Sequence, residues 1–213
     1  MDLNKNSLYS KVFSWLGIGL LLTFVVGYYV SFHLDNAVLR GFSTVSIFAE
    51  LIIAFVMGIC LHKLSPTACT ILYIVYCILS GLNFSVIFIA YKVSSIIYVF
   101  LITSAIFLLF AFIGKVSKVD FRKMGIYLLF TLLGIVIVSI VNVFLQSSSL
   151  AFGLSIVSIM LFMGFILYDM KIIDNLYDVF GEEKAAVYGA FQLYIDFINL
   201  FIDILRIFGK SRD

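Results

Sequence analysis

The sequence predicts an all-α polytopic membrane protein with seven transmembrane helices in a single domain, residues 1–213. Hydrophobic residues make up 63% of the chain, charged residues make up 12%, and the mean hydropathy is +1.18. A soluble domain has about 45–50% apolar and about 25% charged residues, so this composition excludes an ordinary globular domain. The charges also leave apolar runs long enough to cross a bilayer, which is the second observation behind the assignment.

The apolar runs give the expected helices in order. Residues 11–32 carry one charge, Lys11, at their edge. No small-x-small cleavage site follows, so this run is interpreted as an anchor and not as a signal peptide. Residues 42–61 form the second run, with Glu50 near its middle. Once the longer runs are divided, the expected spans are 11–32, 42–61, 68–90, 93–114, 125–145, 150–173 and 186–208.

Two of the apolar runs are too long for one crossing. Residues 68–114 contain a single charge, Lys92. As one helix they would be about 70 Å long, whereas a bilayer core is about 30 Å thick. We therefore expect the chain to turn at Tyr91–Lys92. Residues 125–170 pose the same problem, and the polar stretch 146–149 is the expected turn.

The segment after the sixth run has a different pattern. Apolar residues recur at helical spacing as far as Phe180, while Lys171, Asp174 and Asp178 occupy the other face. Gly181 is the expected stop. We expect helix six to continue beyond the bilayer as an amphipathic extension whose charges form a solvated face.

The distribution of Lys and Arg predicts the orientation. With a cytoplasmic N-terminus, nine of them lie inside and five outside if the last run crosses the bilayer. If the last run turns back, the count becomes twelve against two. The rule favours a cytoplasmic N-terminus in both cases, and whether the last helix crosses fully stays open.

Several classes of function are excluded by composition. The net charge of +2 is small and scattered, so no nucleic-acid partner is expected, and the bilayer is the expected environment. Three Cys residues in or beside apolar runs give no disulfide framework. No nucleotide-binding or Ser-hydrolase motif is present, and no cofactor is expected.

Four acidic residues are expected at membrane depth: Glu50, Asp169, Asp196 and Asp203. Ionisable groups are costly there and usually face a cavity or a partner. Glu50 lies close to the middle of its span, so we expect it to line a cation pathway or to be protonated. The alternative is a structural hydrogen bond to another helix.

One face of the last helix is polar. Asp196, Asn199 and Asp203 follow an i, i+3, i+7 pattern, and Gln192 and Arg206 extend it within an arc of about 80°. Such a face is unfavourable in lipid, so we expect the other helices to surround this one. The alternative is an interfacial helix that lies half in water.

Asp169 lies near the end of the sixth span, with Ser155 and Ser158 on roughly the same face. It is either an interfacial carboxylate that reaches water or a buried partner of Asp196. Two carboxylates in contact at low dielectric cannot both ionise cheaply, so they share a proton and titrate as a pair. Such a pair is a pH-sensitive latch, and its oxygens could also bind Ca²⁺.

The last two helices resemble those of the Bax inhibitor-1 family, the transmembrane Bax inhibitor motif proteins. The resemblance is specific over residues 150–209. The length of the whole chain is that of the compact bacterial members of the family. The segments that carry it are Leu167-Tyr168-Asp169, Leu193-Tyr194-Ile195-Asp196-Phe197-Ile198-Asn199-Leu200-Phe201 and Leu205-Arg206-Ile207-Phe208-Gly209.

This resemblance implies six helices around a central C-terminal helix, in a multi-pass protein of the bacterial plasma membrane. It implies a pH-sensing pair at Asp169 and Asp196, a helix-two carboxylate at Glu50, and passive Ca²⁺ leak in response to protons. Asn199 and Asp203 complete the expected cation pathway. Some relatives carry a basic latch residue at the end of helix two. The matching region here reads Cys60-Leu61-His62-Lys63, so that arginine is not carried over.

Two other functions fit a pair of membrane aspartates. A protonatable pair suits a proton-coupled carrier of a small solute or ion as well as it suits a leak channel. An intramembrane aspartyl protease also needs two such residues, and Tyr168-Asp169 resembles half of the signature of presenilin-like proteases. The other half, Gly-x-Gly-Asp, is absent, because Leu193-Tyr194-Ile195 precedes Asp196. We therefore expect no enzymatic activity.

Overall fold

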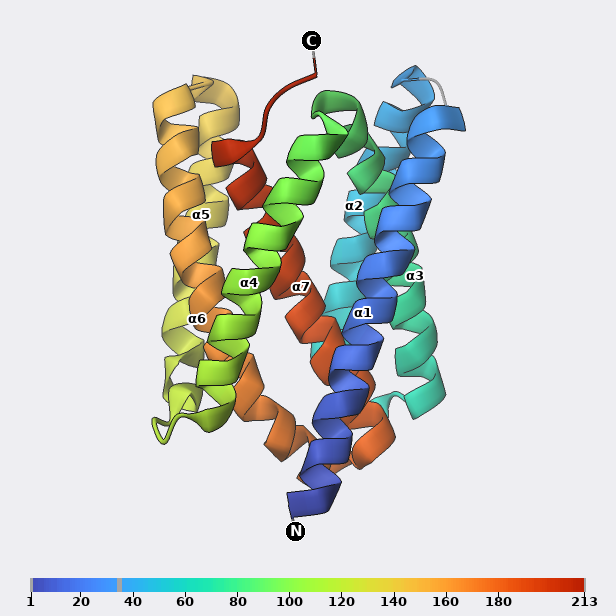
Figure 1. Cartoon of the computed structure of the whole chain (residues 1–213), viewed down its shortest axis with the longest axis vertical. Helices are drawn as coiled ribbons and strands as arrows, with labels where there is room; N and C mark the ends of the chain where they lie inside the picture. The colour runs from blue at the N-terminus through green and yellow to red at the C-terminus, as the bar shows by residue number, and fades with distance from the viewer. Residues whose placement is uncertain (1, 34–35, 213) are drawn as a thin grey trace. The chain divides into compact units, whose positions relative to one another are not determined.

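A computed structural model describes the backbone of residues 2–33 and 36–212, and the side chains of residues 7–33 and 45–212. The side chains of Lys5 and Arg40, which enter the charge count above, lie outside the described residues. The described backbone is almost entirely helical (Figure 1). Its α-helices are α1 (Asp2–His33), α2 (Asn36–Ile59), α3 (Pro66–Ala90), α4 (Val93–Val116), α5 (Gly125–Leu145), α6 (Ser148–Phe180) and α7 (Glu182–Phe208), and two short 3₁₀ helices are η1 (Leu61–Lys63) and η2 (Phe121–Met124).

Six of the described helices are long and apolar enough to cross a membrane, namely all except α2. The described apolar part of α2, Val45–Ile59, is shorter. The chain is therefore a multi-pass membrane protein, and the count of seven spans stays a prediction. Among the six, α7 is the most enclosed: 67% of its apolar window is buried, against 39% or less in the others.

Both expected turns inside the long apolar runs are confirmed. α3 ends at Ala90 and α4 begins at Val93, so the chain turns at Tyr91–Lys92. α5 ends at Leu145, and Gln146 follows with φ of 49°, the left-handed conformation that commonly ends a helix.

Several helix bounds differ from the sequence prediction; α2, for example, runs from Asn36 to Ile59 and not over residues 42–61. The first helix begins at Asp2 and not at residue 11, and the last begins at Glu182 and not at residue 186. α6 runs past the expected limit of its span at residue 173 to Phe180, which confirms the helical extension. Gly181 ends it with φ of 78°. A single left-handed residue suffices as a turn because Gly pays no steric penalty there, so α7 starts at once.

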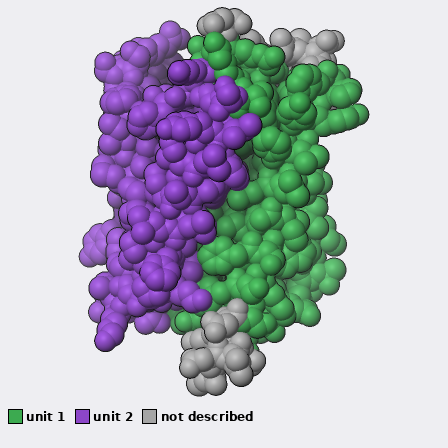
Figure 2. All heavy atoms as spheres, in the orientation of Figure 1, with its two compact units in different colours: residues 1–93, 173–194, 211–213 green, residues 94–172, 195–210 purple. Residues whose placement is uncertain are grey.

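The described chain forms two compact units, coloured separately in Figure 2. Unit 1 comprises residues 1–93, 173–194 and 211–213. Within it α3 packs against both α1 and α2. The contact between α1 and α3 is close at Gly81, where a Cβ atom would lie 2.6 Å from Cβ of Val26. A side chain at this position would push the two helices apart.

Unit 2 comprises residues 94–172 and 195–210, which hold α4, α5, most of α6 and the second half of α7. α4 approaches α6 at Gly114, which faces Leu167 and Met170. Asp120, in the loop before α5, receives a hydrogen bond from Arg122 Nε at 2.7 Å. That bond holds the pKa of the Asp120 carboxyl below its usual range.

Candidate functional site

Asp169 and Asp196 meet inside unit 2. Their side chains are only 4% and 3% exposed. A side-chain hydrogen bond joins the two carboxyls. Asp169 is therefore a buried partner of Asp196 and not an interfacial carboxylate that reaches water.

The two carboxyls come together because of where their helices turn. Asp169 lies eleven residues before the end of α6, and Asp196 lies fourteen residues after the start of α7. At about 1.5 Å per residue these paths from Gly181 differ by only about one helical turn. Ile173, one turn after Asp169 on α6, is also fully buried, so Asp169 lies well inside the protein.

One oxygen of the pair has no partner. Oδ2 of Asp196 is buried and makes no hydrogen bond to any described residue. Buried oxygens of this kind are rare in folded proteins and mark places where a proton, a water molecule or a cation is accommodated. The hydrogen-bonding capacity of the pair is therefore not fully used, as expected for a group that exchanges one hydrogen-bond partner for another.

A second unsatisfied oxygen lies on α4. Thr103 is fully buried, and its hydroxyl oxygen has no hydrogen-bond partner among the described residues. It shares a face of α4 with Phe100 and Phe107, whose rings both lie 5.4 Å from the ring of Phe197. This hydroxyl therefore lies on the face of α4 that packs against α7.

Phe107 shows that an apolar run does not identify the lipid-facing residues. It lies within such a run, yet it is only 2% exposed. Its ring packs edge-on against Phe197. The neighbouring Leu108, at 57% exposure, faces outward instead.

Asp203 has a different set of partners from the pair. It is 5% exposed and forms hydrogen bonds with the hydroxyls of Ser155 and Ser158. Nη1 of Arg206 lies 3.3 Å from its Oδ1, while the arginine side chain itself is 63% exposed. The sequence places the two serines on the same face of the helix as Asp169, but their hydroxyl groups form hydrogen bonds with Asp203. Asn199, also predicted for the pathway, donates to the carbonyl of Ile195 in its own helix at 2.8 Å.

Glu50 lies in unit 1 within a polar cluster formed with α3. The Ser80 hydroxyl is 2.5 Å from Oε1, and Nδ2 of Asn83 donates to Oε2 at 3.0 Å. Ser46, on the same helix as Glu50, donates to Oδ1 of Asn83 at 2.7 Å. Glu50 is therefore hydrogen-bonded to another helix, the alternative weighed from the sequence. Its place in a cation pathway stays a prediction.

The Glu50 cluster continues to the last helix through hydroxyl groups. Ser80 is hydrogen-bonded to Tyr194. The Tyr194 hydroxyl is 2.5 Å from Oγ1 of Thr23, which is also 3.0 Å from the carbonyl oxygen of Cys77. The order of groups is thus Glu50, Ser80, Tyr194, Thr23 and the Cys77 carbonyl.

This series of hydrogen bonds can run in two directions, because each hydroxyl group donates only one hydrogen bond. If Glu50 is ionised, Ser80 donates to it, Tyr194 donates to Ser80 and Thr23 donates to Tyr194. The Cys77 carbonyl then receives nothing from Thr23. If Glu50 is protonated, every donation reverses and Thr23 donates to the carbonyl. Only the protonated carboxyl satisfies all the contacts at once.

Three groups of this hydrogen-bonded series cannot be found by looking for charged residues in the apolar runs. Thr23, Ser80 and Tyr194 are uncharged, and only the pairing of Ser80 with Asn83 at i and i+3 in an apolar run signals them. Lys184 carries a charge, yet it is only 6% exposed. Its ammonium donates to the Leu64 carbonyl at 2.7 Å and lies 4.5 Å from the ring centroid of Phe180.

No group of three or more His, Cys, Asp or Glu side chains able to hold a metal occurs among the described residues. The pair offers at most four carboxyl oxygens, whereas Ca²⁺ takes six to eight oxygen ligands. The site therefore fits transient contact with a cation better than a closed metal cage.

Comparison with known proteins gives consistent matches along the chain. A family model described as "Inhibitor of apoptosis-promoting Bax1" matches residues 5–213. The inner membrane protein YbhL of Escherichia coli K12 is 34% identical over 95% of this chain and 91% of its own length. An uncharacterized protein of Deinococcus radiodurans is 35% identical over 96% and 90%, and one of Borreliella burgdorferi is 34% identical over 98% and 94%. The chain belongs to the Bax inhibitor-1 family.

Proposed function

We propose that the protein is a passive, pH-sensitive Ca²⁺ leak channel and that the Asp169–Asp196 pair is its gate. The observation that carries the proposal is the hydrogen bond between two carboxyls that are almost completely buried. Passive leak is also what the resemblance to the family implies. The proposed activity includes no covalent step.

Gating depends on the proton that the two carboxyls share. With one proton between them, the two carboxyls are joined by a charge-assisted O–H···O⁻ bond, which is stronger than a neutral one. When that proton leaves, two like charges face each other in a medium poorer than water and repel. Raising the pH therefore moves the protein away from the bonded state. When both groups are neutral, an ordinary hydrogen bond remains and nothing drives them apart.

Ca²⁺ is the proposed ion because the polar groups on α7 are oxygen donors. Asp196, Asn199 and Asp203 lie on one face of the helix, and Ca²⁺ prefers carboxylate and carbonyl oxygens. Carboxylates in low-dielectric surroundings attract cations over anions. Glu50 is proposed to belong to the same pathway.

The proposed topology places the N-terminus in the cytoplasm of a bacterium and six helices around α7 in the plasma membrane. The balance of Lys and Arg supports the orientation. The high burial of α7 among the candidate spans supports its central position.

The test measures Ca²⁺ leak from proteoliposomes that contain the purified protein, at mildly acidic and mildly alkaline pH. Asp169→Asn and Asp196→Asn should each flatten the pH dependence, because an Asn–Asp pair stays hydrogen-bonded without a shared proton. Asp178→Asn, which removes an exposed carboxylate from the same helix as Asp169, is the matched control. A wild-type pH response in both single variants would show that this pair is not the sensor.

The same vesicles separate the leak from a carrier. A leak follows the Ca²⁺ gradient alone, so Ca²⁺ flux should persist when the pH is the same on both sides of the membrane and no proton gradient exists. Uptake that requires the proton gradient would contradict the leak and establish proton-coupled transport.

A further inference from the structure

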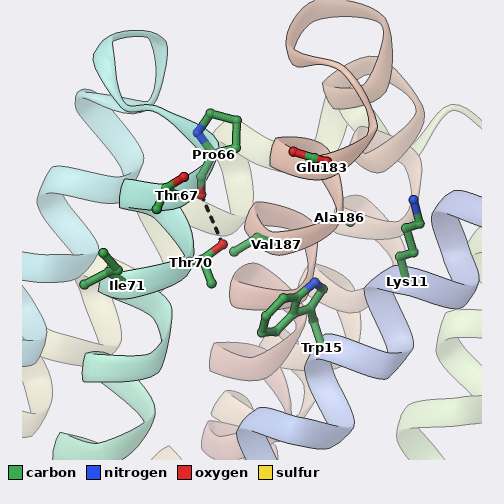
Figure 3. A pocket seen from close by; sticks show the side chains of 9 residues that line it. All are labelled: Lys11, Trp15, Pro66, Thr67, Thr70, Ile71, Glu183, Ala186 and Val187. Carbon is green, nitrogen blue, oxygen red and sulfur yellow. Dashed lines mark hydrogen bonds between the residues drawn. The ribbon is translucent and has the colours of Figure 1, made fainter.

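A cavity of about 550 Å³ opens in unit 1 between three helices (Figure 3). Candidate spans begin at Ser7, Pro66 and Glu182, and the cavity lies within about two turns of all three. It therefore lies at one surface of the membrane, at the depth of lipid headgroups. Its lining comes from α1 (Lys11, Trp15), α3 (Pro66, Thr67, Thr70, Ile71) and α7 (Glu183, Ala186, Val187).

The cavity has one cationic and one anionic group. Lys11 Nζ lies 3.0 Å from Oε1 of Glu182 and is half exposed, so its ammonium remains accessible. Ser7 donates to the same oxygen at 2.8 Å, and Glu182 is thus already paired. The carboxylate that lines the cavity is Glu183, which has no partner among the described side chains. In Figure 3 Glu183 is seen between Pro66 on one side and Lys11 on the other, with Trp15 below them.

The first turn of α3 is a second part of the lining that favours an anion. Ser65 caps this helix and accepts the N–H of Ala68, while Pro66 occupies its first turn. The N–H of Thr67 precedes the intrahelical hydrogen bonds, as in any helix start, and the helix dipole is positive there. A phosphate group in the cavity is therefore favoured both by this helix end and by the ammonium of Lys11.

The deeper part of the cavity is apolar. Trp15 packs edge-on against Tyr73, and its indole N–H has no acceptor among the described residues. Ile71 is 56% exposed, while Ala186 and Val187 form a buried wall. Trp is typical of the membrane interface, where its ring lies against lipid and its N–H reaches a polar partner.

We propose that this cavity binds the headgroup of a phospholipid that carries both a phosphate and a primary ammonium, of the phosphatidylethanolamine type. Lys11 and the start of α3 hold the phosphate, and Glu183 holds the ammonium. Trp15 and Ile71 contact the glycerol and the upper acyl chain. The volume fits a headgroup, since small-ligand sites measure about 300–1,000 Å³. The site is independent of the proposed leak activity.

The pairing of charges predicts a ranking of lipids. Phosphatidylglycerol brings the phosphate but sets a hydroxyl and not an ammonium against Glu183. Phosphatidylcholine brings a methylated ammonium that donates no hydrogen bond. Both should bind more weakly than phosphatidylethanolamine, by about twofold to fivefold, the range for one partly exposed charge pair.

The experiment is native mass spectrometry of the detergent-purified full-length protein, titrated with each of the three lipids. Lys11→Gln should weaken binding of all three, because all carry phosphate. Glu183→Gln should weaken phosphatidylethanolamine alone and abolish the preference. Lys118→Gln and Asp178→Asn remove exposed charges outside the cavity and should change neither affinity nor ranking.

The comparison of lipids on the wild-type protein needs no variant to fold. Equal binding of phosphatidylethanolamine and phosphatidylglycerol by the wild type would overturn the proposal. So would a preference that survives Glu183→Gln, or an equal loss in the two control variants.

Discussion

The hydroxyl of Tyr194 on α7 lies 2.5 Å from that of Thr23 on α1, and through Ser80 the same tyrosine reaches Glu50 on α2. A carboxyl on one helix is therefore joined to the last helix by hydroxyl groups alone. Because each hydroxyl donates one proton, the protonation state of Glu50 sets the direction of every donation as far as Thr23.

Tyr194→Phe removes the central hydroxyl of this chain and leaves Thr23 and Ser80 without it. Tyr194 is fully buried, so water cannot replace the lost partner. We expect a loss of stability of about 1–3 kcal/mol, the cost of leaving buried polar groups unsatisfied. Thermal unfolding in detergent measures it. Tyr98→Phe, at a tyrosine that is 64% exposed, is the control and should change little.

Glu50→Gln keeps hydrogen-bonding capacity and removes the ionisable group. If Glu50 lines the cation pathway, Ca²⁺ leak in proteoliposomes should fall while the melting temperature stays close to that of the wild type. The amide can still donate to Ser80, so the chain to Thr23 keeps the direction that satisfies the Cys77 carbonyl. Unchanged flux in this variant would assign Glu50 a structural role only.

A cysteine at position 196 should be protected from reagents dissolved in the lipid. The background replaces the three native cysteines with alanine, and the reference is a cysteine at the exposed position Leu108. Asp196 is 3% exposed, so a lipid-soluble maleimide should label position 108 much faster than position 196. Equal labelling rates would contradict the enclosed position of this part of α7.

Gly114→Ala tests the close approach of α4 and α6. A Cβ atom there would lie 2.9 Å from Cβ of Met170 and 3.2 Å from Cα of Leu167, so the helices must move apart. Overpacking of this kind costs about 1–3 kcal/mol. Gly134→Ala on α5 meets no atom within 4 Å and should be neutral or slightly stabilising. Equal melting temperatures for the two variants would show that α4 and α6 are less tightly packed than described.

The sequence predicted the helices well because bilayer thickness limits their length. The turns at Tyr91–Lys92 and at Gln146 followed from that limit and from local polarity. The burial of Asp169 was less certain from sequence, because a residue near a span boundary can reach water or turn inward. The one-residue turn at Gly181, which decides where α7 starts, has no counterpart in hydropathy.

Side-chain partners were the part that sequence reasoning missed. Ser155 and Ser158 lie on one helical face, but helical periodicity does not say which neighbouring helix that face meets, and they bond to Asp203. Phe107 has the apolar surroundings of a lipid-facing residue yet packs on Phe197. Hydropathy alone does not show this contact, because in a membrane protein it does not distinguish lipid from protein interior.

The turn at Gly181 also bears on how the chain enters the membrane during synthesis. Of the six candidate spans, α7 has the lowest hydropathy, and it carries Asp196 and Asp203. A segment of this kind partitions poorly into lipid by itself. One residue separates it from the much more apolar α6. A linker of that length does not allow α6 to insert into the membrane well before α7. Integration of the last helix is therefore expected to occur together with α6, as a hairpin delivered in one step.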